Sequence, residues 1–225
     1  MNDQDQELVA LLGQMNQWWE NNPYHSVRID TVGRYMDTTS TMYYYLDANN
    51  RRRYRGETRT KLPFESHFRF QVIDGVSYMD FPESGIYLAN GSVIVYEAFV
   101  QATLGDLTQV NVLLNASKER SLRERNGNKE IVLIMDPKKL GVGPANADIS
   151  LVIRYDARPQ FTHMEQTRMG LVQNTTFTLL STNQAEVLAA LPKFAPTEQA
   201  RQDINFDEAL KKDILYYRTL RSQGA

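Results

Sequence analysis

Hydrophobic positions near the start of the chain recur every three or four residues, which is the period of a helix. Within residues 7–19 the apolar side chains Leu8, Leu12 and Met15 share this spacing, and Pro23 follows the segment. A proline beyond a run with this period marks the end of a helix. The first predicted element is therefore an amphipathic helix.

Beyond this helix the hydrophobic period changes to two, which is the period of a β-strand. Asp74-Gly75 lies between two alternating runs, and this dipeptide is a strong signal for a hairpin turn. Asn and Asp at residues 47–50 favour a second turn, because both residues tolerate left-handed backbone angles. The predicted strands cover residues 26–31, 42–46, 52–60, 68–72 and 76–81.

The second half of the chain repeats this organisation after an interruption. Residues 82–91 are expected to be a turn-rich connection, and residues 92–114 are apolar enough for a strand, a helix or one of each. The charged residues 118–129 are interpreted as a solvated helix end or a hairpin loop. Further strands are predicted at residues 131–135, 149–155, 161–167 and 171–180, and a C-terminal amphipathic helix at residues 206–220.

These elements together predict an α+β fold. Its centre is a large curved antiparallel sheet, an incomplete β-barrel, that helices cover, and an extra helix ends the chain. Residues 1–195 are expected to form one half-barrel domain. Residues 196–225 are expected to be a polar linker followed by a helix that packs on the same domain.

Composition narrows the classes of function. The formal net charge is −2, so no global field attracts polyanions, and nucleic acid is not an expected partner. There is no cysteine, which removes disulfides, thiolate nucleophiles and cysteine-based metal sites. No apolar run approaches the roughly 20 residues of a transmembrane helix, and residues 1–6 lack the features of a secretory signal.

Candidate catalytic groups are sparse in the sequence. His25, His67 and His163 fall on three separate predicted strands and show no paired spacing, so a metal site is not expected. These histidines are interpreted as surface or partly buried polar residues, and no cofactor is expected. Carboxylates occur at predicted turns, where backbone chemistry explains them, at Asp74, Asp80, Glu83, Asp136 and Asp156.

The densest local feature is a tyrosine- and arginine-rich segment at residues 43–61. Tyrosine rings and arginine side chains on a sheet would stack on a single nucleic-acid strand. The alternative is a solvated outer face on which long basic side chains cover the tyrosines. The near-neutral net charge favours this second interpretation.

The chain resembles the LolA/LolB-like family of bacterial envelope proteins over about residues 7–194. The motifs that carry this resemblance are YYLD at 44–47, RYR at 53–55, VIDGVSYMDFP at 72–82 and, more weakly, IVLIMDP at 131–137 followed by 151–155. The resemblance implies an incomplete, strongly curved barrel whose apolar cavity holds acyl chains during lipid or lipoprotein transfer through the periplasm. The tail from about residue 197 departs from the family pattern.

The resemblance also implies roles for particular residues. An arginine that holds the carrier's lid closed, or that contacts a partner, would be one of Arg51, Arg53 and Arg55. The apolar cavity would be lined by Leu8, Leu12, Met15, Trp19, Phe68, Phe70, Val72, Met79, Phe81, Leu151 and Ile153. Alternatively, these residues simply form the core between helix and sheet, with no cavity.

Three functions follow as hypotheses. The first is a non-enzymatic carrier or binding protein for lipid or lipidated protein in the cell envelope, with an envelope protein as a further partner. This location implies an export signal, which residues 1–6 do not show. A cytoplasmic location is the alternative. The second is an enzyme that uses the same cavity, which predicts a pocket with one strongly perturbed carboxylate or histidine. The third is an interaction protein that uses the tyrosine- and arginine-rich strands.

Overall fold

The computed structural model describes residues 3–34, 36–62, 64–73, 76–90, 115–126, 128–136, 139, 149–155, 161–168, 170–194 and 206–222. Its helices are α1 (Asp3–Asn21), α4 (Gln184–Ala189) and α5 (Phe206–Ser222). Its strands are β1 (His25–Gly33), β2 (Met36–Leu46), β3 (Arg52–Leu62), β4 (Ser66–Ile73), β5 (Val76–Phe81), β6 (Ile86–Asn90), β7 (Ser117–Arg125), β8 (Asn128–Met135), β9 (Ile149–Tyr155), β10 (Phe161–Arg168) and β11 (Leu171–Ser181).

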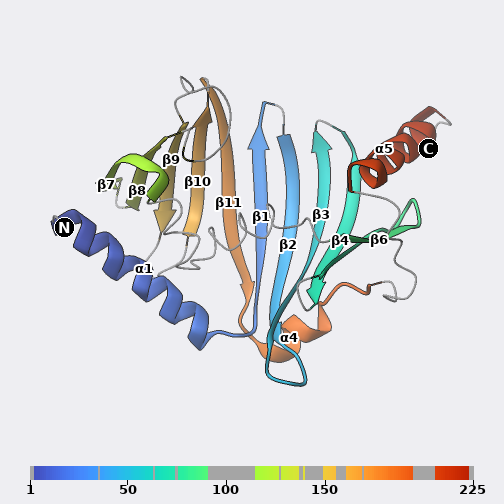
Figure 1. The fold of residues 1–225 in the computed structure, drawn as a ribbon, viewed down its shortest axis with the longest axis horizontal. Coiled ribbons are helices and arrows are strands. Elements are labelled where there is room, and N and C mark those ends of the chain that lie inside the picture. Colours follow the sequence, from blue (N-terminus) through green and yellow to red (C-terminus); the bar gives the residue numbers. More distant parts are fainter. Residues whose placement is uncertain are drawn as a thin grey trace. The chain divides into compact units, whose positions relative to one another are not determined.

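The strands are hydrogen-bonded in the order β6-β5-β4-β3-β2-β1-β11-β10-β9-β8-β7 (Figure 1). Neighbours from β2 to β6 and from β7 to β11 pair antiparallel. Among the described residues, β6 and β7 are the two strands at the ends of this order. The predicted α+β fold, with its antiparallel sheet and C-terminal helix, is confirmed.

The chain divides into two compact units, and each is described by itself. Unit 1 contains residues 1–22, 31–34 and 95–177, and unit 2 contains residues 23–30, 35–94 and 178–225. The predicted boundary at residues 195 and 196 does not coincide with this division and stays a prediction.

In unit 1, helix α1 lies against β7 and buries Leu8 and Leu11. Strand β8 alternates in burial, and Ile131, Leu133 and Met135 form its buried side. The predicted N-terminal helix is confirmed, and it extends a few residues beyond the expected range at both ends.

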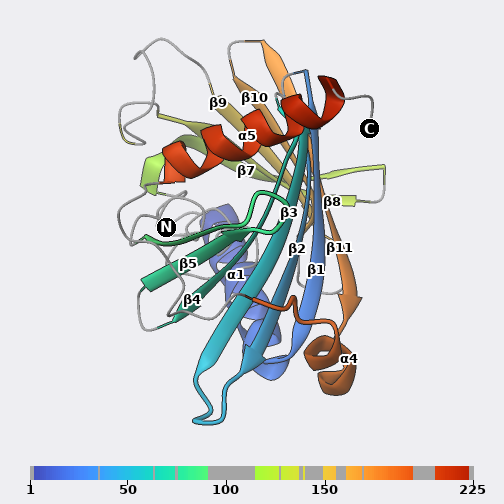
Figure 2. The same ribbon diagram turned by 90° about the vertical axis from the view of Figure 1, so that its right-hand side faces the viewer.

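In unit 2, strands β2 to β6 form a meander whose direction turns progressively from β2 to β5 (Figure 2). The first hairpin turn is held by Asp47, whose carboxylate accepts hydrogen bonds from the backbone N–H of Asn49 at 2.8 Å and of Arg51 at 2.9 Å. Asn50 adopts a left-handed φ of 57°, which asparagine tolerates better than most residues. This turn, predicted from its Asp and Asn residues, is confirmed.

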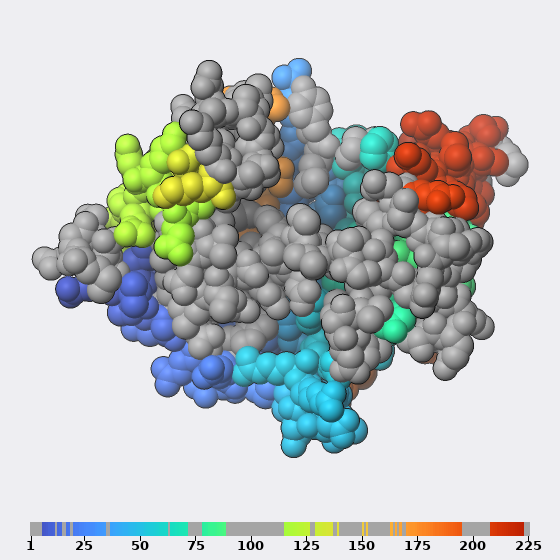
Figure 3. Space-filling model, in the orientation of Figure 1, coloured from blue at the N-terminus to red at the C-terminus, as the bar shows by residue number. Residues whose placement is uncertain are grey.

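Two helices complete unit 2. The side chain of Asn183 accepts hydrogen bonds from the backbone N–H of Ala185 and Glu186, which caps α4, and α4 contacts β2. Helix α5 contacts β4 and β6. Both α5 and the turn between β2 and β3 lie at the molecular surface (Figure 3).

Two sequence-based expectations need correction. Residues 82–91 were expected to be a turn-rich connection, but the turn ends at Gly85 and β6 follows it. Residues 118–129 were expected to be a helix end or hairpin loop, but most of them belong to the exposed strand β7, which pairs with β8. In both cases pairing with a neighbouring strand determines the conformation. Residues 92–114 lie outside the described residues.

None of the described helices combines the length and the apolar character that crossing a membrane requires.

Candidate functional site

The sheet of unit 2 has one apolar face, which strand alternation produces. Phe70 of β4 pairs with Met79 of β5, and Met79 pairs with Leu88 of β6. The rings of Phe68 and Phe81 lie 5.7 Å apart on the same face. Phe70, Phe81 and Leu88 are completely buried, and Met79 and Phe68 nearly so.

This apolar face also extends onto β2 and β3. Met42 of β2 pairs with Gly56 of β3, and Gly56 pairs with Phe70. A Cβ atom at Gly56 would lie 2.7 Å from Sδ of Met42 and would also overlap the ring of Phe70. Within residues 40–44, 54–58, 68–70, 79–81 and 86–88, the positions on this face carry no charged side chain.

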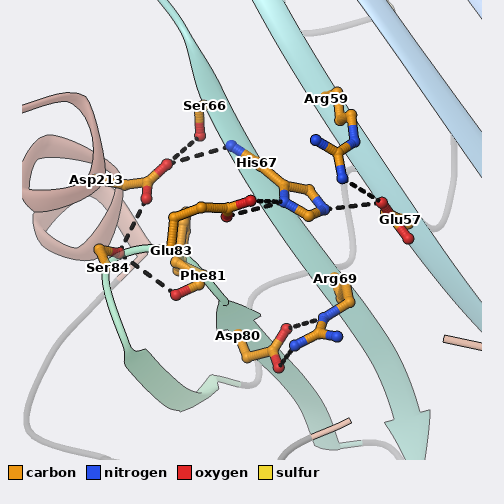
Figure 4. A network of polar contacts seen from close by, with 10 residues as sticks. All are labelled: Glu57, Arg59, Ser66, His67, Arg69, Asp80, Phe81, Glu83, Ser84 and Asp213. Atoms are coloured by element: carbon orange, nitrogen blue, oxygen red, sulfur yellow. Dashed lines mark hydrogen bonds and ion pairs between the residues drawn. The ribbon is translucent and has the colours of Figure 1, made fainter. Parts of the chain in front are cut away.

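The opposite face of the same strands is polar, and a charged cluster lies on it around His67 (Figure 4). Nδ1 of His67 lies 2.6 and 2.8 Å from the two carboxylate oxygens of Glu83, and Nε2 lies 2.9 Å from Oε1 of Glu57. Glu57 also accepts a hydrogen bond from Arg59 at 3.2 Å. The imidazole therefore bridges β3 and the turn that follows β5.

Asp213 attaches helix α5 to this cluster (Figure 4). Its Oδ2 accepts hydrogen bonds from the Ser66 hydroxyl at 2.8 Å and from the backbone N–H of His67 at 3.3 Å. Its Oδ1 accepts a hydrogen bond from the Ser84 hydroxyl at 2.9 Å. Asp213 is completely buried, so three donors from β4 and from the turn between β5 and β6 hold one carboxyl group of α5.

Burial changes the ionisation of two groups on α5. Burial raises the pKa of the Asp213 carboxyl above its ordinary value, while hydrogen bonds from Ser66 and Ser84 act in the opposite direction. Burial also raises the pKa of Tyr217 to about 12, and the nearby carboxylates of Glu83 and Asp213 add to this increase. Burial therefore shifts the pKa of both groups in the direction that favours the neutral form.

A second ion pair lies on the polar face. Arg69 donates two hydrogen bonds to the carboxylate of Asp80, at 2.8 and 2.6 Å, and Asp80 is completely buried. This pair raises the pKa of Arg69 above its ordinary value, with the hydrogen bond to Asp80 as the largest cause. Asp80 lies inside β5, so its assignment to a turn in the sequence analysis was wrong.

The hydrogen bonds of this cluster connect separate elements of the fold. Hydrolysis by a serine nucleophile needs a hydroxyl hydrogen-bonded to a base such as an imidazole. Here both ring nitrogens of His67 already face carboxylates, and the hydroxyls of Ser66 and Ser84 donate to Asp213 instead. Among the described residues, no group of three or more His, Cys, Asp or Glu side chains has an arrangement that would hold a metal ion.

The predicted cavity residues fall into both units. Phe68, Phe70, Met79 and Phe81 lie on the apolar face of unit 2, and Leu8 is buried in unit 1. In unit 1, the register places Leu151 and Ile153 opposite Leu133 and Ile131. The side chains that lie outside the described residues are those of Leu12, Met15, Trp19, Val72, Leu151 and Ile153.

The three arginines proposed for a lid or partner contact have different surroundings. Arg53 forms an ion pair with Asp47 at 2.9 Å within the hairpin. Arg55 donates a hydrogen bond of 3.4 Å to the carbonyl oxygen of Pro192. Arg51 is exposed next to the turn.

The cluster around His67 was not predicted from the sequence as a unit. Its members come from β3, β4, the turn after β5 and α5, and the hydrogen bond from Ser66 to Asp213 spans 147 positions. The only local signal was the placement of His67 on an alternating strand, which led to its interpretation as a surface or partly buried residue. It is in fact 5% exposed.

The similarity of this chain to known proteins is low in sequence and in structure. No protein-family model matches the chain, and no curated protein matches it. LprF from Mycobacterium bovis is 12% identical with a TM-score of 0.42, over 76% of this chain and 92% of that one. The Mycobacterium tuberculosis lipoprotein LppX is 13% identical with a TM-score of 0.44, and the match covers 80% of this chain and 100% of that one. MucB is 12% identical with a TM-score of 0.44, and the match covers 86% of this chain and 66% of that one.

Proposed function

We propose that this protein is a non-enzymatic carrier or binding protein for the acyl chains of a lipid or a lipidated protein in the bacterial cell envelope. The observation that carries the proposal is the apolar face of unit 2, which extends across five neighbouring strands without a charged side chain in the ranges given above. An acyl chain needs such a surface and no polar group for specificity.

Burial of an acyl chain on this face would contribute enough free energy for stable binding. Each buried methylene contributes about 0.8 kcal/mol, so a dozen methylenes contribute roughly 10 kcal/mol before the costs of immobilisation. Phe68 is the natural position for contact with a ligand, because it keeps 8% exposure while its neighbours Phe70 and Phe81 are completely buried.

The residues expected from the sequence to contact acyl chains remain proposals, for each unit by itself. Those of unit 2 are Phe68, Phe70, Val72, Met79 and Phe81, and those of unit 1 are Leu8, Leu12, Met15, Trp19, Leu151 and Ile153. One of Arg51, Arg53 and Arg55 is proposed to contact a lid or an envelope partner. The resemblance of residues 44–55 and 72–82 to the LolA/LolB-like family supports a periplasmic or envelope location.

Native mass spectrometry of the purified protein, combined with displacement of a fluorescent fatty acid, tests the proposal. Co-purified lipid, or saturable displacement by an unlabelled fatty acid, is the expected result. A protein that carries no lipid and takes up no fatty acid would mean that the apolar face is only a filled core, and the carrier function would then be wrong.

A pair of variants locates the binding surface. Phe68→Glu places a charge on the apolar face and is expected to weaken fatty-acid binding at least tenfold. Leu215→Glu makes the same kind of change on α5, where Leu215 is 58% exposed, and is expected to leave binding unchanged. Circular dichroism and the unfolding midpoint establish that both variants fold. Equal binding by folded Phe68→Glu would remove this face from the site.

A further inference from the structure

The arginines on the polar face of unit 2 differ in one respect. Three of them have a carboxylate partner: Arg53 with Asp47, Arg59 with Glu57 and Arg69 with Asp80. Arg55 lies between Arg53 and Arg59 on the same face of β3, yet it pairs with no carboxylate in the part of the chain that the structure describes. Its Nη1 donates to the carbonyl oxygen of Pro192, at the long distance of 3.4 Å.

The Nε atom of Arg55 is buried and has no hydrogen-bond partner among the described residues. Its direct cross-strand neighbour is Gln71 of β4, which is only 4% exposed. The Oε1 atom of Gln71 is also buried without a partner among the described residues. Buried polar atoms that lack partners are rare in native proteins, and the unpartnered Nε–H donor of Arg55 is the group that an acceptor oxygen of a ligand would satisfy.

Three tyrosines are neighbours of this pair of residues. The guanidinium carbon of Arg55 lies 5.7 Å from the centre of the Tyr45 ring. Tyr43 is the cross-strand neighbour of Arg55 on β2, and Tyr78 is the neighbour of Gln71 on β5. The ring beneath the guanidinium restricts its plane, which leaves the Nε edge in a defined direction.

The chemistry of these side chains selects an anion. A guanidinium offers parallel N–H donors that match the two oxygens of a carboxylate or phosphate. A glutamine amide carries two N–H donors on the opposite side from its oxygen, so Gln71 supplies a further donor when the amide turns over. A neutral carbonyl such as that of Pro192 is a weaker partner for a part-buried cation than an anion is.

We propose that Arg55 and Gln71 form a binding site for an anionic group, a carboxylate or a phosphate, which replaces the carbonyl oxygen of Pro192 as the partner of Arg55. Pro192 follows α4, so the anion competes with the contact that ties this segment to β3. The site lies on the face opposite to Phe68 and Phe70 and is independent of acyl-chain binding.

The experiment follows the side-chain Nε–H resonance of Arg55 by NMR during titration of the full chain with inorganic phosphate and, separately, with acetate. Sodium chloride keeps the ionic strength constant. We expect a saturable shift with at least one of the two anions, and the stronger of the two identifies the class of ligand. The backbone signals of residues 190–194 are expected to shift with the same midpoint.

Variants separate a specific site from general charge effects. Arg55→Gln and Gln71→Leu are expected to weaken binding at least tenfold, as measured by calorimetry and by the shifts of residues 190–194. Arg52→Gln, on the same strand but exposed, is the matched control and is expected to bind as the unmodified protein does. Backbone spectra confirm that each variant folds.

Three results would overturn the proposal. The first is the absence of a saturable shift with both phosphate and acetate. The second is equal binding by Arg55→Gln and the unmodified protein. The third is a hydrogen bond in solution between Nε–H of Arg55 and Oε1 of Gln71, because the two residues would then satisfy each other.

Discussion

Ser66 donates a hydrogen bond to Asp213 across 2.8 Å, which connects the first residue of β4 with the middle of helix α5. The hydroxyl of Ser84 and the backbone N–H of His67 donate to the same carboxyl group. One buried acidic side chain, with three neutral donors, therefore joins the C-terminal helix to the sheet of unit 2.

Removal of this acceptor is expected to release α5. Asp213→Ala leaves three donors without their acceptor and should lower the free energy of unfolding by about 2–4 kcal/mol. Asp213→Asn keeps one acceptor oxygen and should cost about 1 kcal/mol or less. Urea denaturation measures both values, and hydrogen exchange of α5 shows where the loss occurs.

Glu208→Ala is the control for this prediction. Glu208 is on the same helix but exposed, and it pairs with Lys212 at 3.5 Å, so its loss should cost less than about 0.5 kcal/mol. Equal destabilisation by the alanine and asparagine variants at residue 213 would contradict the role assigned to the hydrogen bonds.

The raised pKa of Asp213 predicts how stability depends on pH. A carboxyl group whose pKa is higher in the folded than in the unfolded state stabilises the fold most when it is protonated, below its unfolded pKa of about 3.9. That contribution is lost as the pH rises through the folded pKa. Unfolding midpoints of the unmodified protein and Asp213→Asn from pH 4 to 7 should therefore converge with rising pH or cross in favour of the variant. Parallel curves would show that Asp213 does not titrate differently on folding.

Tyr217 predicts a second effect at alkaline pH. Its folded pKa of about 12 exceeds the ordinary value of 10, so its contribution is present below pH 10 and is lost between about pH 10 and 12. Tyr217→Phe should reduce the decline in stability over this range. Tyr216→Phe changes the adjacent residue and provides the control, and the absorbance of ionised tyrosine reports the titration directly. A Tyr217 that ionises at its ordinary pKa would contradict its burial.

Gly56 tests how tightly the apolar face is packed. Gly56→Ala would force its Cβ atom against Phe70 and Met42 and should cost about 1–3 kcal/mol. Gly13→Ala is the matched control, because among the described residues no atom beyond its own stretch of helix lies within 4 Å of the added Cβ atom, and helix α1 gains a better helix former. That change should stabilise by about 0.5–1 kcal/mol.

Close packing of Gly56 against Phe70 also predicts that substitutions at the two positions are coupled. The double variant Gly56→Ala with Phe70→Leu should lose less stability than the sum of the two single variants, because the smaller side chain makes room for the added methyl group. Strict additivity in denaturation experiments would argue that the strain lies elsewhere.

The ion pair of Arg69 and Asp80 is expected to contribute far more than the exposed pairs near it. Arg69→Ala removes a bidentate partner from a completely buried carboxylate and should cost about 3–5 kcal/mol. Arg59→Ala removes a 60% exposed arginine from Glu57 on the same face and should cost less than about 1 kcal/mol. Similar losses in the two variants, measured by denaturation, would contradict the effect of burial.

Local sequence patterns were sufficient to predict much of the sheet. Alternation at residues 68–72 and 76–81, separated by Asp74-Gly75, predicts two strands of a hairpin, and the structure confirms both strands and pairs Phe70 with Met79. The period of two directs alternate side chains to opposite faces, so an apolar series in the sequence becomes an apolar face. The terminal helices were predictable from their period of three to four for the same reason.

Local patterns failed where pairing overrides composition. The charged residues of β7 have a weak preference for a strand, yet the partner β8 holds them extended through backbone hydrogen bonds that do not depend on side chains. Strand β6 is short and directly follows a turn, so its five residues offer too little pattern to distinguish it from a loop.

By itself, the sequence determined the class of fold, most strands, both terminal helices and the apolar character of one strand face, because each of these depends on residues close to one another in the chain. Only the tertiary structure decided that His67 lies between Glu57 and Glu83, that Asp213 connects α5 to β4, and that Arg55 lies beside Gln71. These contacts join residues between 10 and 147 positions apart, and side-chain spacing in the sequence holds no information about which distant residues the fold brings together.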